Sequence, residues 1–246
     1  MFIGEPLRIF ETVDSTNEQA KRALAKNKPT EGTAIFAWHQ SQGKGQIGNS
    51  WFGEPKKNIA VSLILYPGFL AVADQFLLNI SISLAVEKFV SNCLEIKTNI
   101  KWPNDIYFQN KKLGGILIEN ILSGKKIQSS IVGIGLNVNQ IDFPKEIPNP
   151  TSFARIGKKE FSPLEILKEL FYSIESEYLK LKAGKQELSK KEYLENLYNV
   201  NEPAIFIFEN NKIQGVIKEI DRFGKLGIEI EGQLQFFDFK EIELVL

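Results

Sequence analysis

The chain has 246 residues and no net charge at neutral pH, because 30 Lys and Arg balance 30 Asp and Glu. A balanced chain creates no long-range field that attracts nucleic acid or anionic lipid, so we expect neither as a partner. The single cysteine excludes an intramolecular disulfide, and no Cys and His cluster has the spacing of a zinc site. No secretory leader is evident, and no run approaches the roughly 18 apolar residues of a membrane span, which predicts a cytoplasmic location.

The first predicted elements are a short strand over Leu7–Phe10 and a helix over Asn17–Lys26. The segment ETVDSTN, Glu11–Asn17, contains three good N-cap residues, Asp14, Ser15 and Thr16. Glu18 stands three residues after Ser15, which is the spacing of a capping box. Two interpretations stay open. These side chains only cap the helix, or they and the free N–H groups of the first turn also bind the polar head of a ligand.

A predicted buried strand over Thr33–His39 leads into the loop QSQGKGQIGNSW, Gln40–Trp51. Clustered glycines imply positive φ angles or a close approach of the backbone to a ligand, because glycine is costly in entropy. Successive N–H groups in such a loop can bind an anion, and Lys44 adds a positive charge. A dinucleotide-binding fingerprint needs a helix after the loop, whereas the next element here is an apolar strand, Asn58–Leu65. That interpretation is therefore excluded.

The middle of the chain predicts a long helix followed by a group of strands. The helix, Asp74–Cys93, has apolar residues near helical spacing and is expected to cover a sheet. Cys93 has no basic or histidine neighbour close in sequence, so we expect a buried, unreactive thiol. The strands are expected at Ile100–Trp102, Ile106–Phe108, Leu113–Leu122 and Ile127–Asn139, with a turn at Gln109–Lys111 between the second and third.

The segment KWPNDIYFQNKKLGGILIE, Lys101–Glu119, sets charged side chains into these apolar strands. Lys and Asp are rarely buried without a partner, so such residues face solvent or meet a charged ligand. Pro103 is expected to end the first strand and to leave Asn104 and Asp105 at a strand terminus. Strand ends are where ligand sites commonly lie in α/β sheets. The segment is therefore a candidate site.

The last third of the chain changes character twice. A Pro-rich loop, Asp142–Arg155, precedes two predicted amphipathic helices, Pro163–Lys182 and Lys185–Tyr198. From Pro203 onward short β runs alternate with turns, which is typical of a small sandwich or barrel. We therefore expect two domains, residues 1–198 and 199–246.

Four motifs, DSTN, QGKGQIGNSW, KWPND with KKLGGILIE, and GIGLNVN, resemble in order and spacing those of the biotin-protein ligases. The resemblance implies an α+β fold, in which a mixed β-sheet covered by helices, as in class II synthetases, precedes a small Src-homology-3-like β-barrel. It implies a biotin-acetyl-CoA-carboxylase ligase that uses ATP and Mg²⁺ to attach biotin, through biotinyl-5'-AMP, to a lysine of a biotin carboxyl carrier domain. No helix-turn-helix segment precedes Phe10, so we expect the monofunctional form without the DNA-binding domain. A homodimer is left open.

The resemblance also implies roles for individual residues. Lys112 would be the essential lysine, Lys44 would add charge, and Asp105 is the better candidate for a general base. A fixed ammonium would offset the repulsion of about 4 kcal/mol between two anions at about 4 Å. No residue is expected to hold a metal on its own. The residues implied in substrate binding are Ser15, Thr16, Asn17, Gln40, Gly43, Gly45, Gln46, Trp51, Asn104, Gly114, Gly115 and Asn137.

Gln46 stands where this family commonly has arginine. A neutral amide forfeits a charge-assisted hydrogen bond, which is roughly twice as strong as a neutral one, so retention of the adenylate is expected to be weaker. Two alternatives remain. One is a lipoate or octanoate ligase of the same fold, although its usual glycine and histidine signature or reactive cysteine is missing. The other is a biotin-binding module without chemistry, against which Lys112 argues.

Overall fold

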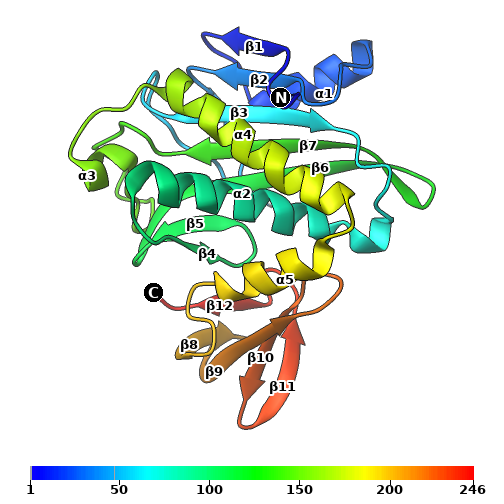
Figure 1. The fold of residues 1–246 in the computed structure, drawn as a ribbon. Coiled ribbons are helices and arrows are strands. Elements are labelled where there is room, and N and C mark those ends of the chain that lie inside the picture. The colour runs from blue at the N-terminus through cyan, green and yellow to red at the C-terminus, as the bar shows by residue number, and fades with distance from the viewer. Residues whose placement is uncertain (1, 47) are drawn as a thin grey trace.

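The computed structural model describes residues 2–46 and 48–246, and its larger part is a seven-stranded sheet (Figure 1). Strands β1 and β2 are parallel, and every other neighbouring pair is antiparallel. The mixed sheet predicted from the sequence is therefore confirmed. In spatial order the strands are β1 (Leu7–Phe10), β2 (Ala34–Ala37), β3 (Ile59–Leu65), β7 (Lys126–Leu136), β6 (Lys111–Ser123), β5 (Asp105–Phe108) and β4 (Asn99–Lys101).

Helices cover both faces of this sheet, but unequally. In Figure 1, α2 (Phe76–Leu94) and α4 (Pro163–Lys182) cross in front of the strands, and α5 (Gln186–Glu195) lies below them. They share one large apolar core with the sheet. On the other face α1 (Thr16–Lys26) covers a much smaller cluster of Ala20, Ile35, Ile64 and Ile131. Much of this second face is therefore not covered by a helix.

One segment is long and apolar enough to cross a membrane by length and composition alone. It is Val72–Leu94, which joins the 3-10 turn η1 (Val72–Asp74) to α2 and has a mean hydropathy of 1.3. The expectation that no such stretch occurs was wrong at the level of composition. In the fold, 67% of an 18-residue stretch of this segment is buried, and α2 packs against the sheet and against α4. The segment is placed as a core helix.

The remaining strands form a separate five-stranded antiparallel sheet, below the main sheet in Figure 1. This agrees with the small Src-homology-3-like domain expected from the sequence. Within the described residues β11 and β12 are the two edges and do not pair, so the pairing is that of an open sheet. The spatial order is β11 (Gln233–Phe237), β10 (Leu226–Ile230), β9 (Asn211–Ile220), β8 (Pro203–Phe208) and β12 (Ile242–Leu244).

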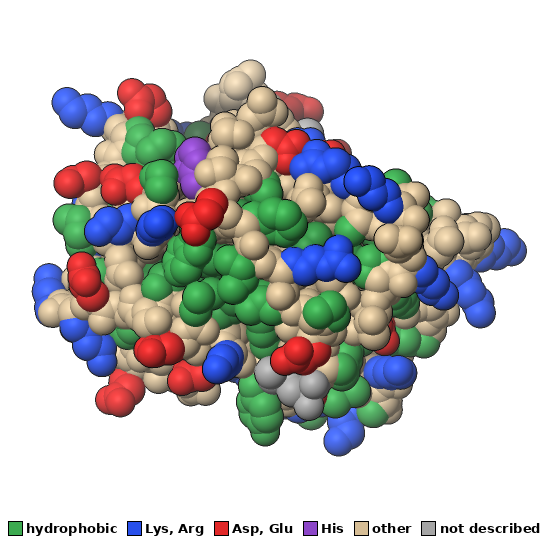
Figure 2. Space-filling model, turned by 90° about the horizontal axis from the view of Figure 1, so that it is seen from above, with side chains coloured by type: hydrophobic (Ala, Val, Ile, Leu, Met, Phe, Trp, Pro, Cys, Tyr) green, Lys and Arg blue, Asp and Glu red, His purple; other side chains and the backbone are tan. Residues whose placement is uncertain are grey.

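The structure adds one helix to the predicted set. α3 (Phe153–Gly157) begins inside the expected loop Asp142–Arg155, and Ser152 caps it by accepting a hydrogen bond from the Arg155 N–H at 3.2 Å. A five-residue helix is too short to show an apolar period, which is why the sequence pattern missed it. On the face shown in Figure 2, acidic and basic side chains are interspersed, in keeping with the balanced charge.

Candidate active site

A cavity of about 600 Å³ opens between the main sheet and the C-terminal sheet. Its wall combines the start of α1, the glycine-rich loop and one face of strands β4 to β7. The C-terminal part of the chain adds residues such as Glu243 of β12 and Phe239, which lies between β11 and β12. That volume suits a small organic ligand. Three segments far apart in the sequence, around residues 15, 45 and 110, therefore meet at one place.

Glycines form the floor of the cavity. Gly115 pairs with Gly135 across β6 and β7, and Gly133 is two residues away on the same face. A Cβ on Gly135 would lie 2.5 Å from the Trp51 ring, and one on Gly133 would lie 2.3 Å from Asn17 Oδ1. A side chain at either position would collide with Trp51 or Asn17, so the glycines let these two side chains approach the β7 backbone closely.

Buried polar groups gather at the α1 end of the cavity. Val13 forms a parallel bridge with Gln40, which extends the β1–β2 pairing and places Thr16 beside that glutamine. Gln40 Oε1 accepts from the Thr16 N–H at 2.7 Å and from the Thr16 hydroxyl at 3.1 Å. Ser15 is the N-cap residue, but its side chain makes no cap hydrogen bond. Of the two interpretations left open, the capping box does not form, and Ser15 lines the cavity instead.

Lys112 and Asp105 form an ion pair at the centre of the floor, with Nζ and Oδ2 2.7 Å apart. Asp105 pairs with Gly115 and Ile106 with Gly114, but Tyr107 then pairs with Lys112 instead of Leu113, which marks a β-bulge. A bulge re-aims the side chains that follow it, and here it brings Lys112 to the face that Asp105 occupies. Gly115 leaves room for the pair, because a Cβ there would lie 2.9 Å from Asp105 Oδ1.

The glycine-rich loop folds back on itself as a small hairpin. The Trp51 N–H donates to the Gly43 carbonyl at 2.9 Å, and the Gly45 N–H donates to the Asn49 carbonyl at 2.8 Å. Lys44 Nζ bonds to Glu18 Oε1 at 2.6 Å, so the loop is tied to α1. Hydrogen bonds from Lys44 and then Lys21 lower the pKa of Glu18. Glu18 is therefore a charged partner in this ion-pair network.

Most of the predicted site residues come together at this cavity. Gly43 is packed inside the loop, and Gly114 packs against Leu136 of β7. Asn137 turns its amide to the Thr151 carbonyl at 3.0 Å. These three lie outside the cavity lining. The predicted residues that do line it are Ser15, Thr16, Asn17, Gln40, Lys44, Gly45, Gln46, Trp51, Asn104, Asp105, Lys112 and Gly115.

Sequence reasoning missed part of the lining. Gly133 and Gly135 carried a usable signal, since two glycines at alternate positions of one strand share a face. Lys101 stood in the noted motif, and its pairing with Asp105 puts it beside the ion pair. Burial lowers the pKa of Lys101, and Asp105 and Glu243 oppose that shift. The C-terminal wall had no signal, because its approach depends on how the two sheets pack.

Comparison with known proteins fits this geometry. The family model described as biotin/lipoate A/B protein ligase matches residues 9–137, more than half of the chain. The chain belongs to this ligase family. Within it, the chain is 33% identical over 174 residues to the bifunctional ligase/repressor BirA of Bacillus spizizenii, covering 69% of this chain and 53% of that protein. The chain thus spans about half the length of the first curated relatives it matches.

Two further members of the family match over more of their length. The biotin-acetyl-CoA-carboxylase ligase of Mycobacterium tuberculosis is 25% identical over 232 residues, which is 92% of this chain and 84% of that protein. The biotin protein ligase of Aquifex aeolicus in complex with biotin and ATP has a TM-score of 0.81 and 29% identity, over 97% of this chain and 98% of that one. The ligase fold thus extends over both sheets.

Proposed function

We propose that this protein attaches biotin to a lysine of a biotin carboxyl carrier domain in two ATP-dependent steps. The observation that carries the proposal is the layout of the cavity. Buried hydrogen-bonding groups lie at one end, a glycine floor runs beneath, and the Lys112–Asp105 pair lies on that floor. The likeness to an Aquifex aeolicus ligase that binds biotin and ATP supports the same assignment.

In the first step an oxygen of the biotin carboxylate would attack the α-phosphorus of ATP. The bond from that phosphorus to the β-phosphate oxygen breaks, and pyrophosphate leaves with the bonding electrons. Lys112 would lower the repulsion between the two anions and stabilise charge in the transition state. Because Lys112 is bonded to Asp105, it would exchange this carboxylate for the substrate's anionic oxygens. Lys44 would likewise leave Glu18.

In the second step the carrier lysine amine would attack the acyl carbon of biotinyl-5'-AMP. The amide bond forms, the acyl C–O bond breaks, and AMP leaves. The amine has to lose a proton, and Asp105 is our candidate to accept it, since loss of the Lys112 contact would free its carboxylate. The reaction needs the acyl group held in place, which is the role we assign to Ser15, Thr16 and Gln40.

Mg²⁺ would enter with the nucleotide. This ion is usually held through one or two carboxylates together with substrate phosphates. Asp105 and Glu243 are carboxylates in the cavity lining. Over residues 2–46 and 48–246 no group of three or more His, Cys, Asp or Glu could hold a metal ion. When bound, Mg²⁺ would neutralise phosphate charge.

The test is pyrophosphate release from MgATP with biotin, lipoate or octanoate offered separately. The proposal expects pyrophosphate release with biotin and not with lipoate or octanoate. Mass spectrometry should then identify the bound adenylate as biotinyl-AMP. The family takes its name from both biotin and lipoate ligases, so the other acids are informative. Release only with lipoate or octanoate would transfer the assignment to that branch. Tight biotin binding without pyrophosphate release would instead indicate a biotin-binding module without chemistry.

A further inference from the structure

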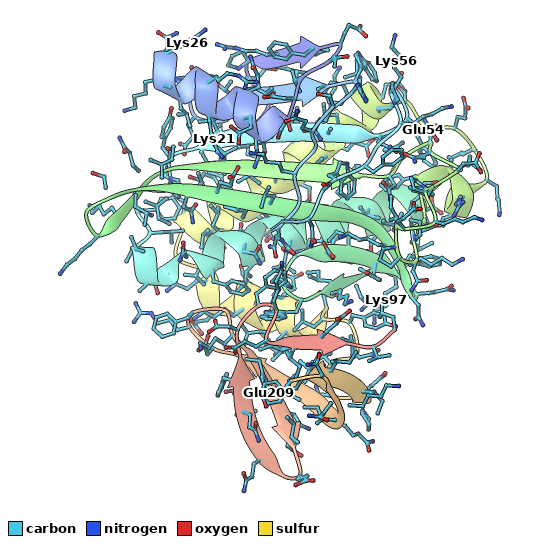
Figure 3. The ribbon with its side chains drawn as sticks, turned by 180° about the vertical axis from the view of Figure 1, so that it is seen from behind. Lys21, Lys26, Glu54, Lys56, Lys97 and Glu209 are labelled. Carbon is cyan, nitrogen blue, oxygen red and sulfur yellow. The ribbon has the colours of Figure 1, made fainter. Side chains whose placement is uncertain are left out.

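Glu119 of strand β6 lies next to the polar end of the cavity but is not part of the cavity lining. Its Oε2 accepts a hydrogen bond from Asn17 Nδ2 at 2.8 Å, and Lys21 Nζ lies 2.8 Å from its Oε1. Figure 3 shows Lys21 on the side of α1 that faces the strands. Both oxygens of Glu119 are therefore held, one by an amide and one by a cation.

The contact fixes which way the buried Asn17 amide points. A carboxylate can only accept, so the amide turns its nitrogen to Glu119 and its oxygen to Ser62. The Ser62 hydroxyl donates to Asn17 Oδ1 at 2.6 Å and to Thr16 Oγ1 at 2.7 Å, so its one hydrogen is shared between two acceptors. Ser62, Asn17 and Thr16 are all buried. The charge of Glu119 thus orders a chain of hydrogen bonds that ends at the cavity.

The order of that chain decides what the cavity presents to a ligand. The one hydrogen of the Ser62 hydroxyl is used within the chain, and the Thr16 hydroxyl donates to Gln40 Oε1. Gln40 Oε1 also accepts a hydrogen bond from the Thr16 N–H, so the Nε2 group of this glutamine is available to donate to a ligand. Thr16 Oγ1 has a lone pair left to accept. A matching ligand carries an N–H beside a carbonyl oxygen, as the cyclic urea of biotin does.

We propose that Glu119 is a positioning residue that sets the hydrogen-bond polarity of this end of the cavity and so selects a ureido head group. The inference rests on the proposed function and deepens it, since it names a residue outside the cavity that decides between a cyclic urea and an acyl group without an N–H. Lys21 supports the arrangement. Burial would lower the pKa of Lys21, but the hydrogen bonds to Glu119 and Glu18 outweigh this and raise it.

The experiment compares the wild-type chain with Glu119→Gln, measuring Kd for biotin by calorimetry and KM for biotin and ATP. A glutamine is isosteric but can turn either end toward Asn17, so the chain loses its fixed direction. We expect Kd and KM for biotin to rise about tenfold or more, with KM for ATP and kcat changed less than about twofold. Glu187→Gln is the matched control, because that side chain is 80% exposed on α5.

A swap separates positioning from a merely structural role. Asn17→Asp alone would face Glu119 with a second carboxylate and should weaken biotin binding strongly. Combined with Glu119→Gln, it restores a donor opposite an acceptor and still offers an oxygen to Ser62, so biotin affinity should recover at least partly. Ser62→Ala is a second route, because it removes the middle of the chain and should reproduce the loss in biotin affinity.

Biotin analogues methylated at a ureido nitrogen complete the test. Wild type should reject the analogue that blocks the Thr16 contact, and Glu119→Gln should discriminate less. Biotin affinity equal to wild type in Glu119→Gln, or no recovery in the double variant, would overturn the inference while wild-type activity leaves the proposed function intact. Failure of wild type to bind biotin would instead remove both.

Discussion

The two faces of strand β7 differ sharply: one faces α2 and α4, and the other faces the cavity. Val132, Ile134 and Leu136 are buried aliphatics of the main core. Gly133 and Gly135, which alternate with them, carry no side chain and leave the space that Asn17 and Trp51 occupy. One strand therefore supplies stability with one face and a ligand floor with the other. Changes to the two faces should have separable effects.

The largest effect is expected at the centre of the cavity floor. Lys112→Ala should reduce the rate of adenylate formation by about 10²- to 10³-fold, because it removes a fixed charge from the transition state. Biotin affinity, which depends on the far end of the cavity, should change by much less. Rapid-quench measurement of biotinyl-AMP and calorimetry separate the two. Lys111→Ala, at the exposed neighbouring residue, should behave as wild type; near-normal rates in Lys112→Ala would refute the role.

The two faces can be compared directly on β7. Gly133→Ala puts a Cβ 2.3 Å from Asn17 Oδ1 and should weaken biotin binding about tenfold or more. Leu136→Ala should lower the free energy of unfolding by about 2–5 kcal/mol and leave biotin affinity of the folded protein within about twofold. Urea titration and calorimetry on both variants test this. If each variant lost stability and affinity alike, the two faces would not be independent.

A smaller change is expected in the loop over the cavity. Gln46→Arg would introduce a charged donor beside a bound adenylate, and a charge-assisted bond should slow release of biotinyl-AMP by about tenfold. The measurement is the dissociation rate in a chase with unlabelled biotin. Gln42→Arg adds the same charge to this loop outside the cavity lining and serves as control. An equal effect from both would point to general charge rather than a contact.

The smallest effect belongs to the helix-covered face. Burial raises the pKa of Glu87 above its ordinary value of 4.5, against hydrogen bonds from Ser91 and Thr98. The folded state therefore binds this proton more tightly, so the contribution of Glu87 to stability is fully present below about pH 4.5 and is lost as pH rises through the folded pKa. Glu87→Gln should raise Tm at pH 7 by a few degrees and flatten this dependence. A lower Tm at pH 7 would contradict it.

The pattern of apolar residues predicted the helix-covered face well. The strands at β3, β6 and β7 and helices α2 and α4 were expected within a few residues, because each has an apolar period that packing preserves. The cavity face was harder to predict, because its floor consists of glycines, which contribute no pattern of hydrophobic side chains. Gly115 was expected there, whereas Gly133 and Gly135 were not.

Other parts of the site depended on information that no single segment contains. The bulge that turns Lys112 toward Asp105 is a property of two paired strands. Ser62 and Glu119 join Asn17 from β3 and β6, which are neighbours of β7 only after the sheet has formed. The wall supplied by Phe239 and Glu243 requires the two sheets to be packed together. Such contacts follow from tertiary structure, so sequence spacing could not give them.

The most direct test of the proposed function is the intact mass of a purified biotin carboxyl carrier domain after incubation with this protein, biotin and MgATP. We predict a mass increase of one biotinyl group, which requires both substrates and is lost when the acceptor lysine of the carrier is replaced by arginine. Lys112→Ala should give no increase over the same time. A carrier that stays unmodified in the presence of a folded, biotin-bound wild-type protein would contradict the proposed ligase function.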